Sequence, residues 1–237
     1  MRTIAVGDIH GCAKALRSLL EALQPTPEDC IVFLGDYVDR GPDSKGVISQ
    51  LLELRERSQT VFLLGNHEIM FRGALRGLEP ELWLDNGGRQ TVTSYGGRLD
   101  YVSRDHIEFL ENCLPYFETD KHIFVHANLS EDLPLREQTE HTLFWEHLSA
   151  RIPGPHHSGK HVFCGHTPQP YGAVGSFGHL TCLDTGCVGG YWLTALDVDS
   201  REMWQVSREG HLKENWKIVR KCWSMLRRVT LRPASQE

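Results

Sequence analysis

The fold is set by Ile31-Val32-Phe33-Leu34-Gly35-Asp36-Tyr37-Val38-Asp39-Arg40-Gly41-Pro42. A short apolar run that ends abruptly in glycine, aspartate, arginine and proline is typical of a buried strand running into a polar loop. In α/β folds, the loops at the carboxyl ends of strands carry the chemistry. Two carboxylates three residues apart, beside an arginine, suit a metal-bound phosphate. The structural alternative is a turn in which both aspartates cap backbone groups.

The same pattern occurs on both sides of this stretch. Residues 3–6 form a strand-like run that ends in Gly7-Asp8-Ile9-His10-Gly11, and residues 60–64 form one that ends in Gly65-Asn66-His67-Glu68. Apolar residues at helical spacing follow the first two loops, at 16–23 and 47–54. The chain therefore predicts consecutive strand–helix units that bring acid, amide and imidazole groups to loops of one kind.

The rest of the chain predicts an insertion and a second group of strands. Residues 69–121 form a mostly helical insertion, with helices expected at 79–84 and 104–113 and a turn at 85–88. Strands at 122–125 and 161–164 end at His126 and His166. Segments 180–183, 192–197 and 203–206 are expected to close the fold as an antiparallel group, with Asp199-Ser200 turning the last pair. We expect a single catalytic domain at 1–210 and a helical tail at 211–237.

Composition limits the class of protein. The 237 residues are 40% hydrophobic with a net charge of −6, which fits one globular domain and argues against nucleic acid as a partner. No apolar run is long enough for an integral membrane segment, and a charged residue comes too early for a signal peptide. Seven scattered cysteines without a CxxC pair indicate reduced thiols, so we expect a cytoplasmic protein.

The tail has a different character from the domain. Apolar residues such as Trp216 and Trp223 approximate a helical stripe with basic residues around it. We expect a basic helix that docks on the domain. The alternative is a helix that binds a partner or a membrane surface.

Six side chains that follow predicted strands form a candidate metal site. They combine carboxylate, amide and imidazole groups: Asp8, His10, Asp36, Asn66, His126 and His166. Such mixed oxygen and nitrogen donors suit manganese, iron or zinc better than calcium or magnesium. A single histidine after a strand is more often structural, but five strand ends with the same habit favour a shared metal site.

These motifs, in this order, resemble the signature of the PPP-type serine/threonine phosphatases of the metallophosphoesterase superfamily. The similarity covers roughly residues 3–206, and the stretches Trp83-Leu84-Asp85-Asn86-Gly87-Gly88 and Leu183-Asp184-Thr185-Gly186-Cys187 are most similar to the bacterial and phage branch. The resemblance implies an α/β fold with a central β-sandwich flanked by helices and with metals at the strand ends.

The resemblance also implies a role for each motif residue. Asp36 would bridge two divalent ions, most simply manganese, with Asp8 and His10 on one ion and the other three ligands on the second. A hydroxide shared by the two ions would attack phosphorus directly. Arg40 would bind the phosphate oxygens, His67 would protonate the leaving oxygen, and Asp39 would orient His67.

Several positions depart from the family pattern. His147 stands where a second phosphate-binding arginine is expected, and His147 or the nearby Arg151 is a candidate replacement. Asn86 and Arg98 are weaker substrate contacts, for which a turn or a salt bridge is the structural alternative. Leu64 replaces an arginine of many family members and removes no ligand.

The motifs predict hydrolysis of phosphomonoesters, with a phosphorylated serine or threonine in a protein or peptide as the substrate. A dinucleoside-polyphosphate hydrolase, acting on diadenosine tetraphosphate, shares the metal ligands and is the alternative enzyme. A catalytically silent module that binds phosphoproteins is the alternative from another class. The full ligand set and His67 argue against it.

Overall fold

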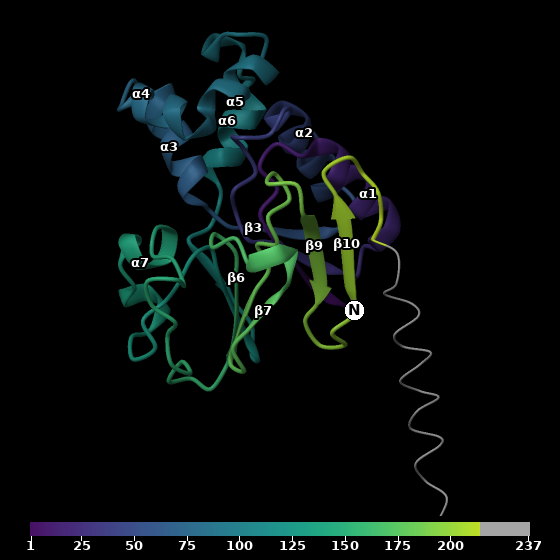
Figure 1. The fold of residues 1–237 in the computed structure, drawn as a ribbon, viewed down its shortest axis with the longest axis vertical. Coiled ribbons are helices and arrows are strands. Elements are labelled where there is room, and N and C mark those ends of the chain that lie inside the picture. Colours follow the sequence, from purple (N-terminus) through teal and green to yellow (C-terminus); the bar gives the residue numbers. More distant parts are fainter. Residues whose placement is uncertain (214–237) are drawn as a thin grey trace, which may run out of the picture.

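Two five-stranded sheets form the centre of the protein in this computed structural model, which describes residues 1–213 (Figure 1). The first sheet has the order β10-β9-β1-β2-β3 and contains Thr3–Val6 (β1), Cys30–Phe33 (β2), Gln59–Phe62 (β3), Trp192–Asp197 (β9) and Met203–Ser207 (β10). The second has the order β4-β5-β6-β8-β7 and contains Tyr116–Glu118 (β4), His122–Val125 (β5), His161–Cys164 (β6), Gly175–Ser176 (β7) and Leu180–Cys182 (β8).

Alternation along the strands packs the two sheets face to face. Ala5 in β1 belongs to a buried cluster with Val32 of its own sheet and with Phe124 and Phe163 of the other. The rings of Phe124 and Phe163 stack with centroids 5.4 Å apart. Successive strand residues point to opposite faces, so their neighbours pack in a second core that includes the helices. The predicted α/β fold, a β-sandwich flanked by helices, is therefore confirmed.

Parallel pairing brings the motif loops to one edge of the first sheet. Strand β1 pairs in parallel with β2, and β2 with β3. Helices α1 (Ala13–Leu23) and α2 (Ser44–Arg55) make the crossovers. In α1 the buried leucines, Leu16, Leu19, Leu20 and Leu23, lie on the face toward the sheet. Because parallel strands end at a common edge, the loops after β1, β2 and β3 meet there.

The insertion forms a helical lobe at one end of the sandwich (Figure 1). It contains Asn66–Leu75 (α3), Pro80–Trp83 (α4), the π-helical turn Leu84–Gly88 (η1), Arg89–Ser94 (α5), the 3₁₀ turn Leu99–Tyr101 (η2) and Arg104–Glu111 (α6). The predicted helix at 104–113 matches α6, and the helix predicted at 79–84 corresponds to α4. The turn predicted at 85–88 lies within η1, where Gly87 has φ 110°.

The closing part of the fold corrects one expectation. Strands β9 and β10 pair antiparallel around a turn at 198–200, as predicted. Strand β8 does not join them, because it pairs in parallel with β6 and antiparallel with β7 in the other sheet. The remaining elements are Leu135–Glu137 (η3), Glu140–Phe144 (α7) and Pro170–Gly172 (η4).

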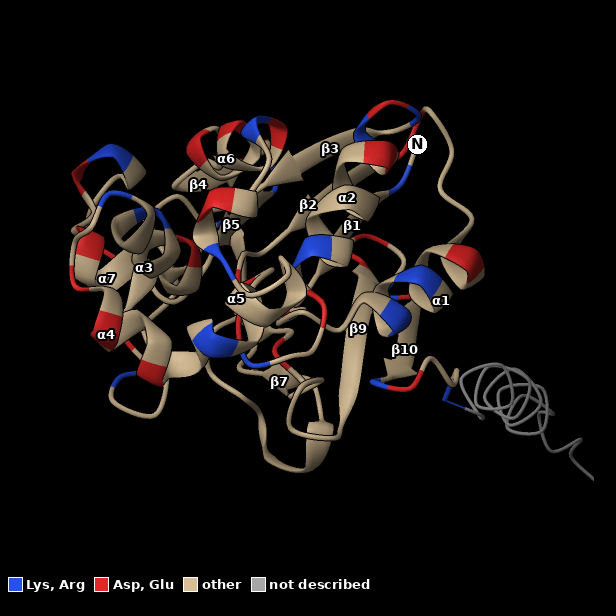
Figure 2. Ribbon diagram, turned by 90° about the horizontal axis from the view of Figure 1, so that it is seen from above, with Lys and Arg blue, Asp and Glu red and all other residues tan. Residues whose placement is uncertain are grey.

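Acidic and basic residues are interspersed over the helices and loops of the described chain (Figure 2). Within residues 1–213, no helix has the length and apolar character needed to cross a membrane. The helix predicted in the tail lies outside the described residues.

Candidate metal-dependent active site

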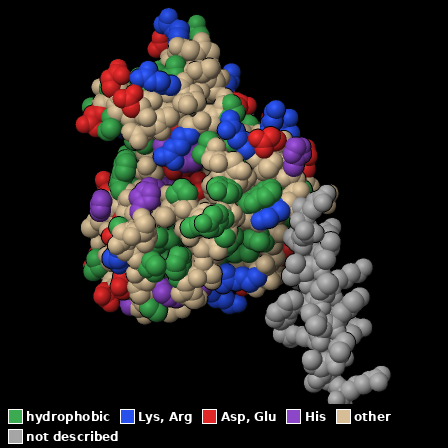
Figure 3. Space-filling view, viewed as in Figure 1, with side chains coloured by type: hydrophobic (Ala, Val, Ile, Leu, Met, Phe, Trp, Pro, Cys, Tyr) green, Lys and Arg blue, Asp and Glu red, His purple; other side chains and the backbone are tan. Residues whose placement is uncertain are grey.

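The predicted ligands come together where the two sheets and the helical lobe meet. Two groups of side chains place their ligand atoms within 4.8 Å of one another, namely His10, Asp36 and His67, and Asp36, His126 and His166. Asp36 belongs to both groups. Histidine and acidic side chains are visible at this junction (Figure 3).

Glycines before the ligands make this close approach possible. A Cβ atom on Gly165, which precedes His166, would overlap the Asp8 carboxylate. A Cβ atom on Gly35, which precedes Asp36, would lie 2.7 Å from Nδ1 of His126, and Gly35 has φ 102°. Side chains from the two sheets can therefore converge only because these positions carry no side chain of their own.

Backbone strain is concentrated at the same residues. Nine non-glycine residues in the described chain have positive φ, and five of them are predicted site residues: His10, Asp36, Asp39, Arg40 and His166. Such conformations cost of order 1–3 kcal/mol each and persist where the surrounding structure imposes them, often at functional sites. The concentration of strained residues supports a functional site at this edge of the sheets.

Asp36 lies between the two groups of side chains. Its Oδ2 lies 3.4 Å from Nε2 of His10, and its Oδ1 lies 3.4 Å from Nε2 of His126. The two oxygens thus face two different imidazoles. Oδ1 also accepts a hydrogen bond of 3.2 Å from the backbone N–H of His67.

Backbone carbonyls set the tautomers of the three ligand histidines. Nδ1 of His10 lies 2.9 Å from the Val38 carbonyl oxygen, Nδ1 of His126 lies 2.7 Å from that of Leu34, and Nε2 of His166 lies 3.3 Å from that of Trp145. Each of these ring nitrogens donates, so the other nitrogen of each ring presents a lone pair to the site. Burial lowers the pKa of all three, to about 3 for His10 and for His166, which keeps the rings neutral.

The arrangement of electron-pair donors fits a metal ion. The free nitrogens of His126 and His166 each lie 3.1 Å from Oδ1 of Asn66. Lone pairs that face one another repel unless a cation lies between them. Asp8 is buried, and burial together with Asp184 and Asp36 raises its pKa, so a divalent cation would also relieve the repulsion among these carboxylates. These donors match the nitrogen and oxygen ligands of borderline metals.

Asp8 lies beside His166 but outside the two groups that share Asp36. Its two oxygens accept hydrogen bonds of 3.2 and 3.0 Å from the His166 backbone N–H. It belongs to neither of the groups whose ligand atoms lie within 4.8 Å. Like that of the other predicted ligands, its role in binding a metal stays a prediction.

His67 and Asp39 form a buried pair beside this centre. Nδ1 of His67 lies 2.8 Å from Oδ2 of Asp39. Nε2 of His67 is buried and makes no hydrogen bond within residues 1–213. Asp36 and Asp39 raise the pKa of His67 against the effect of burial. One ring nitrogen of His67 therefore lacks a partner in the described chain, on a ring whose ligand atom lies within 4.8 Å of those of His10 and Asp36.

The predicted substrate contacts differ in their surroundings. Arg40 is exposed, and its Nη1 lies 2.9 Å from Nε2 of His10. His147 is exposed, with its ring centroid 4.3 Å from that of His166. The Arg151 guanidinium binds Glu146, Glu131 and the Leu129 carbonyl, so a contact with phosphate would require these bonds to break.

The weaker candidates make local contacts in the helical lobe. Asn86 is exposed and donates to the Leu82 carbonyl, and Arg98 pairs with Asp100 at 2.8 Å. Both match the structural alternative. The neighbour of Asn86, Gly87, accepts a 3.0 Å hydrogen bond from the Arg40 N–H, so this turn supports the Arg40 loop.

Glu68 is a functional residue that the sequence motifs did not reveal. Its buried carboxylate accepts hydrogen bonds from the N–H groups of Gly65, Asp36, Tyr37 and Val38 at 2.8–3.3 Å. Asp184 likewise has no role in the predicted site. It is buried at 4% exposure beside the site, and burial raises its pKa to about 7. The only indication in the sequence was that both acidic residues lie within motifs shared with the family.

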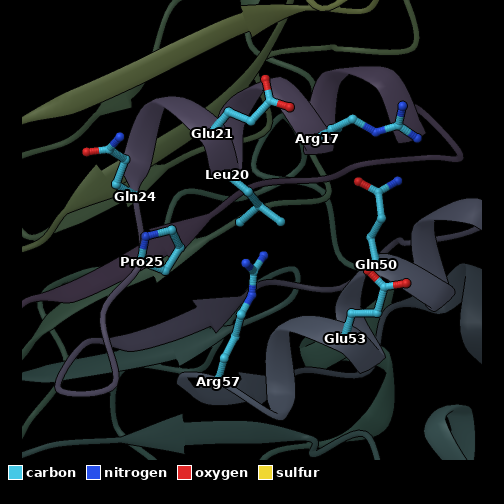
Figure 4. Close-up of a pocket in the computed structure, with 8 residues that line it drawn as sticks. All are labelled: Arg17, Leu20, Glu21, Gln24, Pro25, Gln50, Glu53 and Arg57. Atoms are coloured by element: carbon cyan, nitrogen blue, oxygen red, sulfur yellow. The ribbon is translucent and has the colours of Figure 1, made fainter.

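A surface pocket lies elsewhere on the molecule. It has a volume of about 580 Å³ and lies between the carboxyl-terminal halves of α1 and α2, with Arg17, Leu20 and Arg57 among its lining residues (Figure 4). These helices begin at the motif loops, so their far ends lie away from the strand ends. None of the predicted site residues lines this pocket.

Comparison with known proteins places the chain in a family. The sequence profile of the calcineurin-like phosphoesterases matches residues 1–199. A protein of Salmonella typhimurium named serine/threonine-protein phosphatase 1 is 30% identical over 202 residues, which are 80% of this chain and 88% of that protein.

Relatives with other names are about as similar. A symmetrical bis(5'-nucleosyl)-tetraphosphatase of Coxiella burnetii is 31% identical over 163 residues, 65% of this chain and 50% of that protein, so the chain spans about half of its length. An asymmetrical bis(5'-nucleosyl)-tetraphosphatase PrpE of Oceanobacillus iheyensis is 28% identical over 91% of this chain and 96% of that protein. With the profile and the Salmonella relative, these matches show that the chain belongs to the calcineurin-like metallophosphoesterases, hydrolases that use two divalent metal ions.

Proposed function

We propose that this protein hydrolyses phosphomonoesters of alcohols, above all phosphoserine and phosphothreonine in proteins or peptides. The observation that carries the proposal is the pair of His67 and Asp39 beside Asp36. One ring nitrogen of His67 is held by Asp39 at 2.8 Å, and the other is buried and free within the described chain. A buried, oriented acid of this kind is worth most where the leaving group is poor.

The choice between substrates follows from the leaving oxygen. A serine alkoxide leaves badly without a proton, so His67 would protonate it as the P–O bond breaks. Cleavage of a dinucleoside tetraphosphate expels a nucleotide phosphate, which is already a stable anion. A general acid held in place by Asp39 is most useful for a poor leaving group, and it therefore favours alkyl phosphates as substrates.

The metal ions, when bound, would acidify a water and neutralise phosphate oxygens. Asp8 and His10 would hold one ion, Asn66, His126 and His166 the other, and Asp36 would contact both. Manganese suits this donor set, with iron or zinc as alternatives. The exposed guanidinium of Arg40 would bind the non-bridging phosphate oxygens, and His147, at the rim beside His166, would add a weaker contact.

The second candidate function is hydrolysis of diadenosine tetraphosphate. It is favoured by the two relatives named bis(5'-nucleosyl)-tetraphosphatases. The motif residues around the metals would serve both reactions, so they do not separate the two. A catalytically silent phosphoprotein-binding module would have no use for His67.

The test is a direct comparison of substrates. The manganese-loaded protein is assayed for phosphate release from a phosphoserine peptide and a phosphotyrosine peptide, and for nucleotide release from diadenosine tetraphosphate. We expect the highest kcat/KM on the phosphoserine peptide. Turnover of the dinucleotide alone would contradict the proposal, and binding of the phosphopeptide without turnover would support the silent module.

His67→Asn is the matched variant for this comparison. Loss of a general acid typically costs about 10²–10⁴ in rate. We expect a loss of that order on the phosphoserine peptide and a much smaller loss on p-nitrophenyl phosphate, whose leaving group needs no proton. Equal losses on both substrates would remove His67 from the acid role.

A further inference from the structure

Asp39 is held by more donors than its bond to His67 requires. It is fully buried, at 0% exposure. The indole Nε1–H of Trp83 donates to both carboxylate oxygens, at 3.0 and 2.9 Å, and the Thr91 hydroxyl donates to Oδ1 at 2.7 Å. The backbone N–H of Asp39 donates in turn to the Thr91 and Ser44 hydroxyls, at 2.9 and 3.1 Å.

These donors come from the helical lobe and not from the sandwich. Trp83 ends α4, and Thr91 lies in α5. The Trp83 ring is 1% exposed and stacks on Phe71 of α3 with centroids 4.9 Å apart and an interplanar angle of 8°. A Cβ atom on Gly88 would also overlap the indole, so Gly88 packs closely against it. The indole is therefore held in position by close packing within the lobe.

We propose that Trp83 and Thr91 are positioning residues that make acid assistance by His67 possible, so that the helical lobe gives the site its capacity to cleave alkyl phosphates. This inference rests on the proposed function. Three side-chain donors occupy the Asp39 carboxylate, and together they leave it one orientation, in which Oδ2 meets Nδ1 of His67. That bond fixes the His67 ring, whose other nitrogen, Nε2, has no partner in the described residues.

Loss of the indole N–H would release this constraint without emptying the core. In Trp83→Phe the ring can still stack on Phe71, but the carboxylate loses a donor to both oxygens. A hydrogen bond to a charged group contributes about 1.5–3 kcal/mol. If that energy serves to orient His67, the rate should fall where the leaving oxygen needs a proton and should change little where it does not.

The experiment compares two leaving groups in the full chain loaded with manganese. For Trp83→Phe we expect kcat on a phosphoserine peptide to fall about 10- to 100-fold, the kinetic equivalent of one such hydrogen bond. We expect kcat on p-nitrophenyl phosphate to fall less than about threefold, with unchanged metal content. Thr91→Val removes the second donor at nearly constant volume and should shift the same ratio in the same direction, which keeps the test open if Trp83→Phe does not fold.

Leu110→Ala is the control for packing alone. It removes a buried side chain of α6 in the same lobe and no hydrogen bond to Asp39. It should reduce the melting temperature and leave the ratio of the two rates close to that of the wild type. A ratio unchanged in both Trp83→Phe and Thr91→Val would overturn the inference, because purely structural residues would lower both rates together.

A spectroscopic readout is independent of turnover. In ¹H–¹⁵N spectra, the Trp83 indole N–H should exchange slowly with solvent, and Asp39→Asn should shift its resonance and speed its exchange. If the chemical shift and exchange rate of the indole N–H are the same in Asp39→Asn as in the wild type, the contact between Trp83 and Asp39 is contradicted. If the wild type turns over no phosphoserine peptide, the proposed function fails. If it does so with a substrate ratio that neither variant changes, only the present inference fails.

Discussion

Glu68 shapes the loop that carries the central ligand. Its carboxylate accepts hydrogen bonds from the backbone N–H groups of Asp36 and Tyr37 at 2.8 Å, of Gly65 at 3.0 Å and of Val38 at 3.3 Å. Burial and the Asp36 charge raise the pKa of Glu68, whereas these donors stabilise its ionised form. Glu68 thus positions Asp36, although Glu68 is not itself a predicted metal ligand.

We expect Glu68→Gln to weaken both the fold and metal binding. The side-chain NH₂ of glutamine would face backbone N–H groups, and two donors cannot bond to each other. Each buried donor left without an acceptor costs about 1–3 kcal/mol. Urea unfolding should show a loss of about 2–4 kcal/mol, with reduced manganese content. Glu56→Gln is the control, since Glu56 is 78% exposed. Wild-type stability and metal content in Glu68→Gln would contradict this role.

Arg40 tests the substrate side of the site. Its guanidinium is exposed and reaches Nε2 of His10 at 2.9 Å. Arg40→Ala should weaken inhibition by inorganic phosphate and lower kcat/KM by about 10-fold or more, the loss of one charge-assisted hydrogen bond, while metal content stays unchanged. Arg89→Ala, an exposed arginine paired with Asp85, is the control. If Arg40→Ala loses metal, its role is structural.

At the scale of elements, two histidines of the second sheet, at the end opposite the site, make the stability of the fold depend on pH. His122 and His161 begin the adjacent strands β5 and β6 and lie opposite each other in register. Burial, followed by Arg201, His122 and His179, lowers the pKa of His161 to about 4, and Asp199 is the acidic group near His122. Because the folded pKa lies below the unfolded value of about 6.5, the folded state resists protonation. This contribution to stability is complete above about pH 6.5 and declines as the pH falls toward 4.

His161→Gln should therefore reduce the loss of stability between pH 7 and pH 5. Glutamine can still bond to the Thr181 hydroxyl, which His161 contacts at 2.8 Å, but it does not titrate. Melting temperatures of the variant and the wild type across this range are the measurement. The exposed His157 provides the control substitution, His157→Gln. Parallel curves for wild type and His161→Gln would exclude this histidine as a source of the pH dependence.

The elements with the clearest periodicity were the most predictable. The strands expected at 122–125, 161–164 and 192–197 match β5, β6 and β9. Strands β4 and β7 were missed, because runs of three and two residues carry too little alternation to be recognised. The partner of β8 could not be read from its own residues, since strand pairing depends on the packing of the whole sheet.

At the scale of the molecule, the site depends on closure of the sandwich. Asp8, Asp36 and Asn66 follow strands of the first sheet, and His126 and His166 follow strands of the second. Both groups of converging side chains contain Asp36. Any metal held between these residues would therefore link the two sheets, and metal binding would stabilise the folded state.

The candidate site was predictable at the strand ends and less so in the lobe. Asp36 and His126 directly follow glycine-marked or apolar strand ends, so strand geometry brings them together. The support of Asp39 by Trp83 and Thr91 crosses 44 and 52 residues of chain, a distance over which local pattern carries no information. The contacts of Arg151 with Glu131 and the Leu129 carbonyl span 20 and 22 residues of chain, so they could not be predicted from the local pattern either.

The most direct test of the account is the metal content of Asp36→Asn. The variant and the wild type are saturated with manganese, freed of excess metal by gel filtration and analysed for manganese per chain and for turnover of a phosphoserine peptide. A neutral amide leaves the repulsion between two cations uncompensated. We therefore predict two ions per wild-type chain, at most one in the variant, and loss of hydrolysis with a largely intact fold. Two ions and near-normal turnover in Asp36→Asn would contradict the central role of this carboxylate.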